Sequence, residues 1–239
     1  RVRESRASNR LFSLVRTHFL FCQWAIKDQV DVFWSPRHHL PLLLPSRIKT
    51  VLTIHDLVWV KYPETMAWTN LLLEKLLMPR SLNKANLVTA VSDSTRDDVI
   101  GTFSIDAKKV CKVLAASVEI DPIREFVRLE VDDYFLFVGT LEPRKNLEGL
   151  IEAFRMYSER GGKKTLIIVG AQGWMNPIRA DSELNIKFLG HINDEQLLSY
   201  YKYAYALLLP SLYEGFGLPA IEAMRFGVPV IGSDRGSIP

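Results

Sequence analysis

Residues 134–169 read YFLFVGTLEPRKNLEGLIEAFRMYSERGGKKTLIIV, and this stretch decides the fold. It opens and closes with apolar runs, Tyr134–Gly139 and Thr165–Val169, in which polar residues do not alternate. Such runs are typical of parallel strands buried on both faces. Between them, a helical period over Asn146–Arg160 places apolar residues on one face, with Asn146 positioned to cap the helix and a Gly-Gly pair to end it. The stretch therefore predicts a strand, a helix and a second, parallel strand.

The same alternation of apolar runs and helical segments extends in both directions along the chain. A second helix is expected over Asp194–Tyr205. Strands and helices that alternate in this way predict an α/β fold with parallel sheets. The remaining candidate strands are Val30–Trp34, Thr50–His55, Leu87–Val91, Val110–Ala115, Ile186–Leu189, Ala206–Leu209 and Val228–Gly232.

The pattern restarts after a charged stretch, Glu119–Asp133, which contains Pro122 and no clear strand. We interpret it as a linker between a lobe of residues 1–122 and a lobe of residues 123–239. Open α/β units bind ligands at the carboxyl ends of their strands, so two such lobes facing each other predict a binding cleft. No strand precedes the opening helical segment and no helix covers the last strand. We therefore expect a fragment, or the ordered part of a longer chain, incomplete in both lobes.

Composition and charge narrow the class of protein. The 239 residues are 48% hydrophobic and 24% charged, which is ordinary for a globular protein, and the net charge of +3 is too small to predict nucleic-acid binding. The two cysteines, Cys22 and Cys111, sit among apolar residues and predict neither a disulfide nor a zinc site. No apolar run reaches the roughly 18 residues of a membrane span, and the start lacks a signal-peptide pattern. A cytoplasmic location is expected.

Residues 1–20 contain five arginines and one glutamate. A solvated helix face explains this bias, and attraction to an anionic membrane surface is the alternative. The alternative predicts peripheral contact with the inner face of the cytoplasmic membrane.

Two adjacent cations, Arg144 and Lys145, follow a predicted strand and stand just before a helix start. Backbone N–H groups and the positive end of the helix dipole favour an anion at such a place. Lysine acts as a point charge and arginine as a bidentate fork, and both suit phosphate. A solvated pair of loop residues is the alternative.

The segment Pro210–Met224 reads PSLYEGFGLPAIEAM and joins a strand to a helix. Its two glycines let backbone N–H groups approach a ligand closely. Glu214 lies in the loop, and Glu222 follows about one turn into the helix. We interpret one carboxylate as an acceptor for ribose hydroxyls and the other for those of a transferred hexose. A partner for the helix dipole is the alternative for Glu222.

This segment resembles the E-x7-E motif of glycosyltransferase family 4, the retaining enzymes of the GT-B fold. Four other segments agree with that family: Val138–Asn146, Phe188–Ile192, Thr53–Leu57 and Ala90–Ser92. The resemblance covers roughly residues 30–239. It implies two Rossmann-like parallel-sheet lobes that face each other across a cleft, with a nucleotide-sugar donor bound by the C-terminal lobe.

The resemblance also implies residue roles. Lys145 and Arg144 would hold the donor diphosphate, and Glu222 the ribose. Glu214 would hold the donor sugar, and His55 would reach the sugar from the other lobe, unless it is only a satisfied histidine at a strand end. The implied catalytic residues are His55, Arg144, Lys145 and Glu214. The implied donor-binding residues are Gly139, Thr140, Leu189, Gly190, His191, Ile192, Leu197, Phe216, Gly217, Leu218 and Glu222.

The chain departs from the family in two places. Many members carry an arginine where this chain has Thr140, so Arg144 and Lys145 must share the diphosphate charge. The connection between Gly170 and Ile186 is also shorter than is typical.

The resemblance implies a front-side displacement in which the leaving phosphate helps to deprotonate the acceptor. We predict no metal and no other cofactor, because Asp97-Asp98 and Asp132-Asp133 lack the spacing of a D-x-D motif. Thr140–Asn146 and His55-Asp56-Leu57 resemble bacterial mannosyltransferase-like members that act in O-antigen or exopolysaccharide assembly. The implied donor is GDP-mannose, with UDP-glucose, other UDP-sugars and GDP-rhamnose as competitors, and the implied acceptor is a glycan or a lipid-linked glycan.

Two other functions are compatible with a GT-B-like pattern. One is a sugar-nucleotide epimerase, and the other is a catalytically silent module that binds nucleotide sugars. The joint presence of Glu214, Glu222, Lys145 and His55 argues against the silent module.

Overall fold

The structure is a computed structural model that describes residues 16–116, 126, 133–174 and 184–239. The chain divides into two compact units, Arg1–Trp59 with Trp68–Leu114, and Val60–Ala67 with Ala115–Pro239. The predicted boundary at residues 122 and 123 and most of the predicted linker lie outside the described residues, so that boundary stays a prediction. Within the described part of the chain, no helix is both long and apolar enough to cross a membrane.

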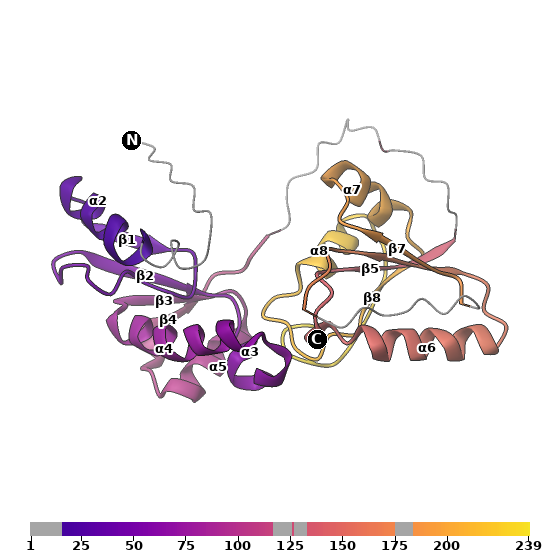
Figure 1. The fold of residues 1–239 in the computed structure, drawn as a ribbon, viewed down its shortest axis with the longest axis horizontal. Helices are drawn as coiled ribbons and strands as arrows, with labels where there is room; N and C mark the ends of the chain where they lie inside the picture. Colours follow the sequence, from indigo (N-terminus) through magenta and orange to yellow (C-terminus); the bar gives the residue numbers. More distant parts are fainter. Residues whose placement is uncertain (1–15, 117–125, 127–132, 175–183) are drawn as a thin grey trace. The chain divides into compact units, whose positions relative to one another are not determined.

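The first unit is built on a parallel sheet with the strand order β1-β2-β3-β4 (Figure 1). Its strands are β1 (Val32–Ser35), β2 (Lys49–Ile54), β3 (Leu87–Ala90) and β4 (Val110–Lys112). Its helices are η1 (Arg16–Leu20), α2 (Phe21–Lys27), α4 (Trp68–Lys84), α5 (Asp93–Phe103) and η3 (Ala107–Lys109). The short α3 (Val58–Lys61) crosses from the first unit to the second.

The second unit is built on a parallel sheet with the strand order β7-β6-β5-β8-β9 (Figure 1). Its strands are β5 (Tyr134–Val138), β6 (Thr165–Val169), β7 (Ile186–Gly190), β8 (Ala206–Leu209) and β9 (Val230–Gly232). Its helices are η2 (Pro63–Thr65), η4 (Pro143–Lys145), α6 (Leu147–Glu159), α7 (Asp194–Tyr203) and α8 (Leu218–Arg225). If these five strands are numbered 1 to 5 along the chain, their order across the sheet is 3-2-1-4-5. The direction of winding therefore reverses between β5 and β8, as in nucleotide-binding Rossmann folds.

Helices cover both faces of this sheet. Because successive side chains of a strand point to opposite faces, β5 contributes Phe137 to one apolar cluster and Leu136 to another. The first cluster contains Leu147, Leu150 and Phe154 of α6, and the second contains Tyr201 of α7. Fully burying one large apolar side chain stabilises a fold by about 1.5–3 kcal/mol. The two clusters therefore stabilise the packing of α6 and α7 against the sheet, and with it the positions of the loops that follow the strands.

Most predicted elements are present, with shifted ends. The helix expected over Asp194–Tyr205 ends at Tyr203, and the strand expected to reach Ala115 ends at Lys112. Both cysteines are free, although Cys111 is only half-buried. The expected cap of α6 is wrong: Asn146 adopts a left-handed conformation (φ 53°) and its side chain does not cap the helix. It donates instead to the carbonyl of Pro210.

Candidate functional site

Two loops lie side by side where the strand order reverses. The first follows β5 and contains η4, and the second follows β8 and contains Glu214. The amide of Leu212 donates to the carbonyl of Arg144 at 2.8 Å, and Asn146 Nδ2 donates to the carbonyl of Pro210 at 3.2 Å. These cross-loop bonds fix the two predicted motifs against each other. The crevice at such a reversal is where open α/β sheets bind ligands.

Glu214 brings the two predicted cations together. Lys145 Nζ donates to Glu214 Oε1 at 2.6 Å, and Arg144 Nη1 donates to Glu214 Oε2 at 2.9 Å. Ser211 Oγ donates to Oε1 at 2.6 Å. Three of the four residues predicted as catalytic therefore form one hydrogen-bonded group in the second unit.

A second carboxylate completes the charge balance. Glu142 Oε1 lies 2.5 Å from Arg144 Nη2, and the side chains of Glu142, Lys145 and Glu214 are all buried. Two cations and two carboxylates give this group no net charge. The sequence predicted a pair of cations ready for phosphate, but the structure pairs both with carboxylates, because a buried charge without a partner costs several kcal/mol.

The pKa of Glu214 reflects these contacts. Burial by itself raises the pKa of the carboxyl group, but the charges of Lys145 and Arg144 and the hydrogen bonds from Lys145 and Ser211 outweigh it, so the pKa falls below its usual range. Glu214 is therefore a carboxylate at neutral pH. In that form it can accept hydrogen bonds from hydroxyl groups but cannot act as an acid.

The predicted glycines shape the two loops. A Cβ atom at Gly139 would lie 3.3 Å from Cε of Lys145, so the glycine makes room for the lysine side chain. Gly217 has a φ of 86° and precedes α8 without a side-chain cap. Leu218 then opens the helix, while Phe216 is half-buried and Thr140 is exposed. The start of α8 has no side-chain cap, but Pro219 lacks an N–H group and the amide of Ala220 donates to the carbonyl of Gly217 at 2.9 Å, so contact of the remaining amides with an anion stays a prediction.

Glu222 lies on α8 and has a partner of its own. The hydroxyl of Tyr201 donates to Glu222 Oε2 at 2.6 Å, and the Tyr201 ring is fully buried. Burial, followed by the charge of Glu222 and this hydrogen bond, raises the pKa of Tyr201 well above its usual value. Tyr201 therefore stays protonated and holds one carboxylate oxygen of the half-buried Glu222.

The other residues predicted to bind the donor lie at the end of β7 and in α7. Leu189, Ile192 and Leu197 pack against the apolar cluster that contains Tyr201. Gly190 and His191 are exposed. The first three side chains thus have a packing role, and contact with the donor stays a prediction for all five residues.

His55 belongs to the first unit, where it follows β2 and is exposed. Its Nε2 lies 2.8 Å from the carbonyl of Pro36, to which it can only donate. In neutral His55, Nδ1 is then the acceptor nitrogen. The His55 amide donates to His38 Nε2 at 3.1 Å, and the two rings lie 5.6 Å apart.

A carboxylate supports this histidine pair. Glu74 Oε2 lies 3.2 Å from His39 Nε2 and 3.6 Å from His38 Nδ1. Burial raises the pKa of Glu74, but the contacts with His38 and His39 and the charges of these residues outweigh burial and bring the pKa to about 2. Burial by itself lowers the pKa of His38, but Glu74 and Asp56 outweigh burial and raise this pKa above its usual value.

Several residues that hold the predicted ones in place could not be identified from the sequence. Ser211 and Glu142 lie inside the two quoted motifs and contact Glu214 and Arg144 within their own loops, but the pairing of Glu214 with Arg144 joins the two loops. Tyr201 lies in the helix predicted over Asp194–Tyr205, where the apolar pattern indicates only a packing role. A buried tyrosine hydroxyl needs a hydrogen-bond partner, and this requirement is the signal by which the sequence could have indicated a polar role for Tyr201. His38, His39 and Glu74 gave none, since α4 brings Glu74 to the histidines from a distant part of the chain.

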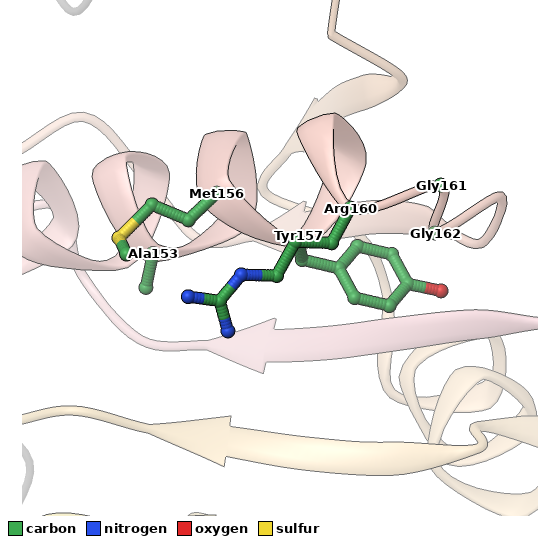
Figure 2. A pocket seen from close by; sticks show the side chains of 6 residues that line it. All are labelled: Ala153, Met156, Tyr157, Arg160, Gly161 and Gly162. Carbon is green, nitrogen blue, oxygen red and sulfur yellow. The ribbon is translucent and has the colours of Figure 1, made fainter.

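A pocket of about 520 Å³ lies away from these loops, at the far end of α6 (Figure 2). At 1.5 Å per residue, this end of α6 is roughly 18 Å from its start. The pocket therefore lies apart from the two loops. Its lining residues are Ala153, Met156, Tyr157, Arg160, Gly161 and Gly162.

The fold and the loops define a class of protein. A Rossmann-type unit with cations and carboxylates at its reversal point, preceded by a second parallel-sheet unit, is a GT-B architecture. The chain belongs to the glycosyltransferases: Glycosyl transferases group 1 matches residues 119–239, and Glycosyltransferase Family 4 matches residues 3–113. The family predicted from the motifs is thereby confirmed.

Two relatives are mannosyltransferases by name. O-antigen chain mannosyltransferase B of Escherichia coli is 32% identical, over 99% of this chain and 69% of its own length. O-antigen chain mannosyltransferase RfbU of Salmonella typhimurium is 31% identical, over 84% of this chain and 55% of its own length. The chain thus spans between about half and just over two thirds of these relatives.

Solved structures confirm the GT-B fold. The lipopolysaccharide outer core galactosyltransferase WaaB has a TM-score of 0.61 and 20% identity, with 97% of this chain and 65% of WaaB covered. WaaG, a glycosyltransferase involved in lipopolysaccharide biosynthesis, has a TM-score of 0.63 and 17% identity, with 98% and 68% covered. At this level of identity the likeness concerns the fold alone.

Proposed function

We propose that this chain is a retaining hexosyltransferase that moves mannose from GDP-mannose to a glycan or lipid-linked glycan in cell-surface polysaccharide synthesis. The observation that carries the proposal is the hydrogen-bonded group of the half-buried Arg144 and the buried Lys145 and Glu214 beside the reversal of strand order. Its cations suit a diphosphate, and its carboxylate suits sugar hydroxyls. The names of the two mannosyltransferase relatives support the choice of sugar. Transfer from a UDP-sugar is the alternative.

The proposed chemistry follows from where charge develops. The bond between the anomeric carbon and the phosphate oxygen breaks while the acceptor hydroxyl adds to the same face of the sugar. The electron pair of that bond goes to the phosphate, which takes the acceptor proton. Lys145 and Arg144 stabilise the negative charge that grows on the leaving diphosphate, often the largest catalytic contribution. This route uses no protein nucleophile.

The remaining residues bind the donor in the proposal. Glu222 accepts hydrogen bonds from the ribose with the oxygen that Tyr201 leaves free. The amides of Phe216, Gly217 and Leu218 contact the phosphate and the sugar, and Leu189–Ile192 border the base. His55 acts on the sugar from the first unit.

We propose that transfer needs no metal ion. The support is that the sequence lacks a D-x-D motif and that two protein cations already supply charge for the diphosphate. Transfer is therefore expected to continue in excess EDTA. Loss of transfer in EDTA, restored by added magnesium or manganese, would contradict this part of the proposal.

The main test combines a transfer assay with binding. The full-length protein should release GDP from GDP-mannose while the sugar appears on the acceptor; an epimerase would release no free nucleotide. Lys145→Ala should weaken GDP binding by about 1.5–3 kcal/mol, the value of a hydrogen bond to a charged group. Lys187→Ala, which removes an exposed lysine of β7, is the matched control and should bind GDP as the wild type does.

The same titrations decide between donors. GDP, UDP, GDP-mannose and UDP-glucose are compared by calorimetry, and the nucleotide with the higher affinity identifies the base. If Lys145→Ala binds both GDP and UDP as tightly as the wild type, the diphosphate assignment is wrong.

A further inference from the structure

Glu214 is held by its partners on both oxygens. Oε1 accepts from Lys145 and Ser211, and Oε2 accepts from Arg144. A carboxylate has about four lone-pair sites, and these bonds use three of them. Glu214 therefore occupies the same cations that the proposed function assigns to a diphosphate.

The charges make this a competition. The buried group has two cations and two carboxylates, and a nucleoside diphosphate adds negative charge to it. In the protein interior, charges interact more strongly than in water. A diphosphate that binds Lys145 and Arg144 must then weaken their bonds to Glu214.

The Glu214 backbone cannot move away to relieve the competition. Its carbonyl accepts from the amide of Ser237 at 3.1 Å and from Ser237 Oγ at 3.0 Å. Gly236 packs so closely that an added Cβ would lie 2.6 Å from the same oxygen. Because the backbone is held and Ser211 Oγ donates to Oε1, the displaced carboxylate stays beside Ser211, and a carboxylate that loses hydrogen bonds away from bulk water needs new donors.

We propose that Glu214 is a displaceable counter-ion that makes the site prefer an intact nucleotide sugar to a free nucleoside diphosphate. This inference rests on the proposed function. When the diphosphate takes Lys145 and Arg144, the sugar hydroxyls of the intact donor replace them as hydrogen-bond donors to Glu214. The ionised phosphates of a free diphosphate only accept hydrogen bonds, so they leave Glu214 without replacements.

The exchange also runs in reverse after transfer. Once the sugar has left with the acceptor, Glu214 loses the hydroxyls and competes again for Lys145 and Arg144. The competition weakens binding of the product diphosphate and favours its release. Glu214 thus acts on product inhibition as well as on the sugar.

The experiment is calorimetric titration of the full-length protein with GDP, UDP, GDP-mannose and UDP-glucose. The quantity compared is the ratio of the two dissociation constants, free diphosphate over the matching sugar nucleotide. Glu214→Gln should bind the free diphosphate about tenfold more tightly, because a competing charge is gone. It should not bind the sugar nucleotide more tightly, so the ratio falls by at least that factor.

Glu142→Gln is the matched control. It removes the same charge from a carboxylate bonded to Arg144. Glu142 does not exchange its cation for sugar hydroxyls in the proposal, so Glu142→Gln should change both dissociation constants by the same factor and leave their ratio unchanged. Ser211→Ala should act in the opposite sense to Glu214→Gln. It removes the hydroxyl that still donates to the carboxylate of Glu214 after the cations have left. Binding of the free diphosphate should therefore weaken more than binding of the sugar nucleotide, and the ratio should rise.

The outcomes separate the inference from the proposed function. If the wild type binds none of the four ligands, the proposed function fails. If the wild type binds them but Glu214→Gln leaves the ratio unchanged or raises it, the counter-ion role is overturned and the proposed function stands. Thermal melting identifies folded variants. If Glu214→Gln does not fold, Ser211→Ala alone decides, and an unchanged or lower ratio overturns the inference.

Discussion

Glu222 and Glu214 lie on one loop–helix unit, yet their surroundings differ. Glu214 is buried among cations, whereas Glu222 is half-buried and bonded to a neutral tyrosine. A ribose contact is the same in the ground state and the transition state, so its loss mainly raises KM. A contact near the reacting bond can strengthen in the transition state, and only such a contact raises kcat.

These differences give a kinetic prediction. Glu222→Gln should raise KM for the donor more than it lowers kcat, and Glu214→Gln should lower kcat more than it raises KM. Steady-state kinetics on the full-length protein measures both. Identical profiles for the two variants, or profiles that are exchanged, would refute the assignment of roles.

Tyr201 should act through Glu222 as a positioning residue. Tyr201→Phe removes the hydroxyl that holds Glu222 Oε2, so KM should rise in the same direction as in Glu222→Gln but by less, with kcat nearly unchanged. Tyr203→Phe removes an exposed hydroxyl from the same helix and is the control. A Tyr201→Phe enzyme with wild-type KM would show that Glu222 needs no support from the tyrosine.

At the scale of elements, the sequence predicted what local patterns determine. The run Thr165–Val169 is buried at every position and has the predicted bounds. The Gly-Gly pair ends α6 as expected. Each result depends on residues within one segment, which apolar periodicity and glycine chemistry can indicate.

What the sequence did not predict depends on distant segments. Asn146 looked like a helix cap, but the loop after β8 brings the carbonyl of Pro210 within 3.2 Å of its side chain. The pairing of Arg144 and Lys145 with Glu214 likewise requires β5 and β8 to be neighbours. Motif spacing contains no information about that neighbour relation. The candidate site residues could thus be named from the sequence, but their contacts could not.

The close approach of β5 and β6 gives an element-scale prediction. A Cβ at Gly170 would lie 1.9 Å from the carbonyl oxygen of Gly139. Gly170→Ala must push apart the ends of β5 and β6, next to the Lys145 side chain. Overpacking of this kind lowers the free energy of unfolding by about 1–3 kcal/mol. Urea unfolding should show that loss of stability, together with weaker nucleotide binding.

Gly101→Ala is the control for this prediction. Gly101 lies in α5 with no atom within 4 Å of an added Cβ, so alanine should stabilise that helix by roughly 0.5–1 kcal/mol. If Gly170→Ala unfolds at the same urea concentration as the wild type, the strand ends tolerate the added methyl group and the packing argument is wrong.

At the scale of the whole molecule, the proposed reaction needs both units. Glu214 and its cations belong to the second unit, and His55 with its supporting histidines belongs to the first. The role of His55 stays a prediction, because its partners within the described residues are those of its own unit. A lipid-linked acceptor would further require the molecule to approach a membrane.

We propose that weak peripheral attachment provides this approach. The Arg-rich start that first suggested it lies mostly outside the described residues. The described part of the chain adds α4, where Trp68, Leu72 and Leu76 are 76%, 48% and 45% exposed at a spacing of four residues. Lys75 and Arg80 are exposed on the same helix, whereas its acidic residue, Glu74, turns inward to the histidines. An apolar and basic face suits an anionic lipid surface.

Sedimentation with vesicles tests this attachment. The full-length protein should bind vesicles that contain anionic lipid, and binding should fall as salt rises, because screening at physiological ionic strength acts over about 8 Å. The triple variant Trp68→Ser, Leu72→Ser, Leu76→Ser should bind less at every salt concentration, since it loses the apolar contact. Ile231→Ser removes a side chain that is 58% exposed on β9, and it should bind as the wild type does. Equal binding to neutral and anionic vesicles would remove the electrostatic argument, and unchanged binding of the triple variant would remove α4 from the membrane contact.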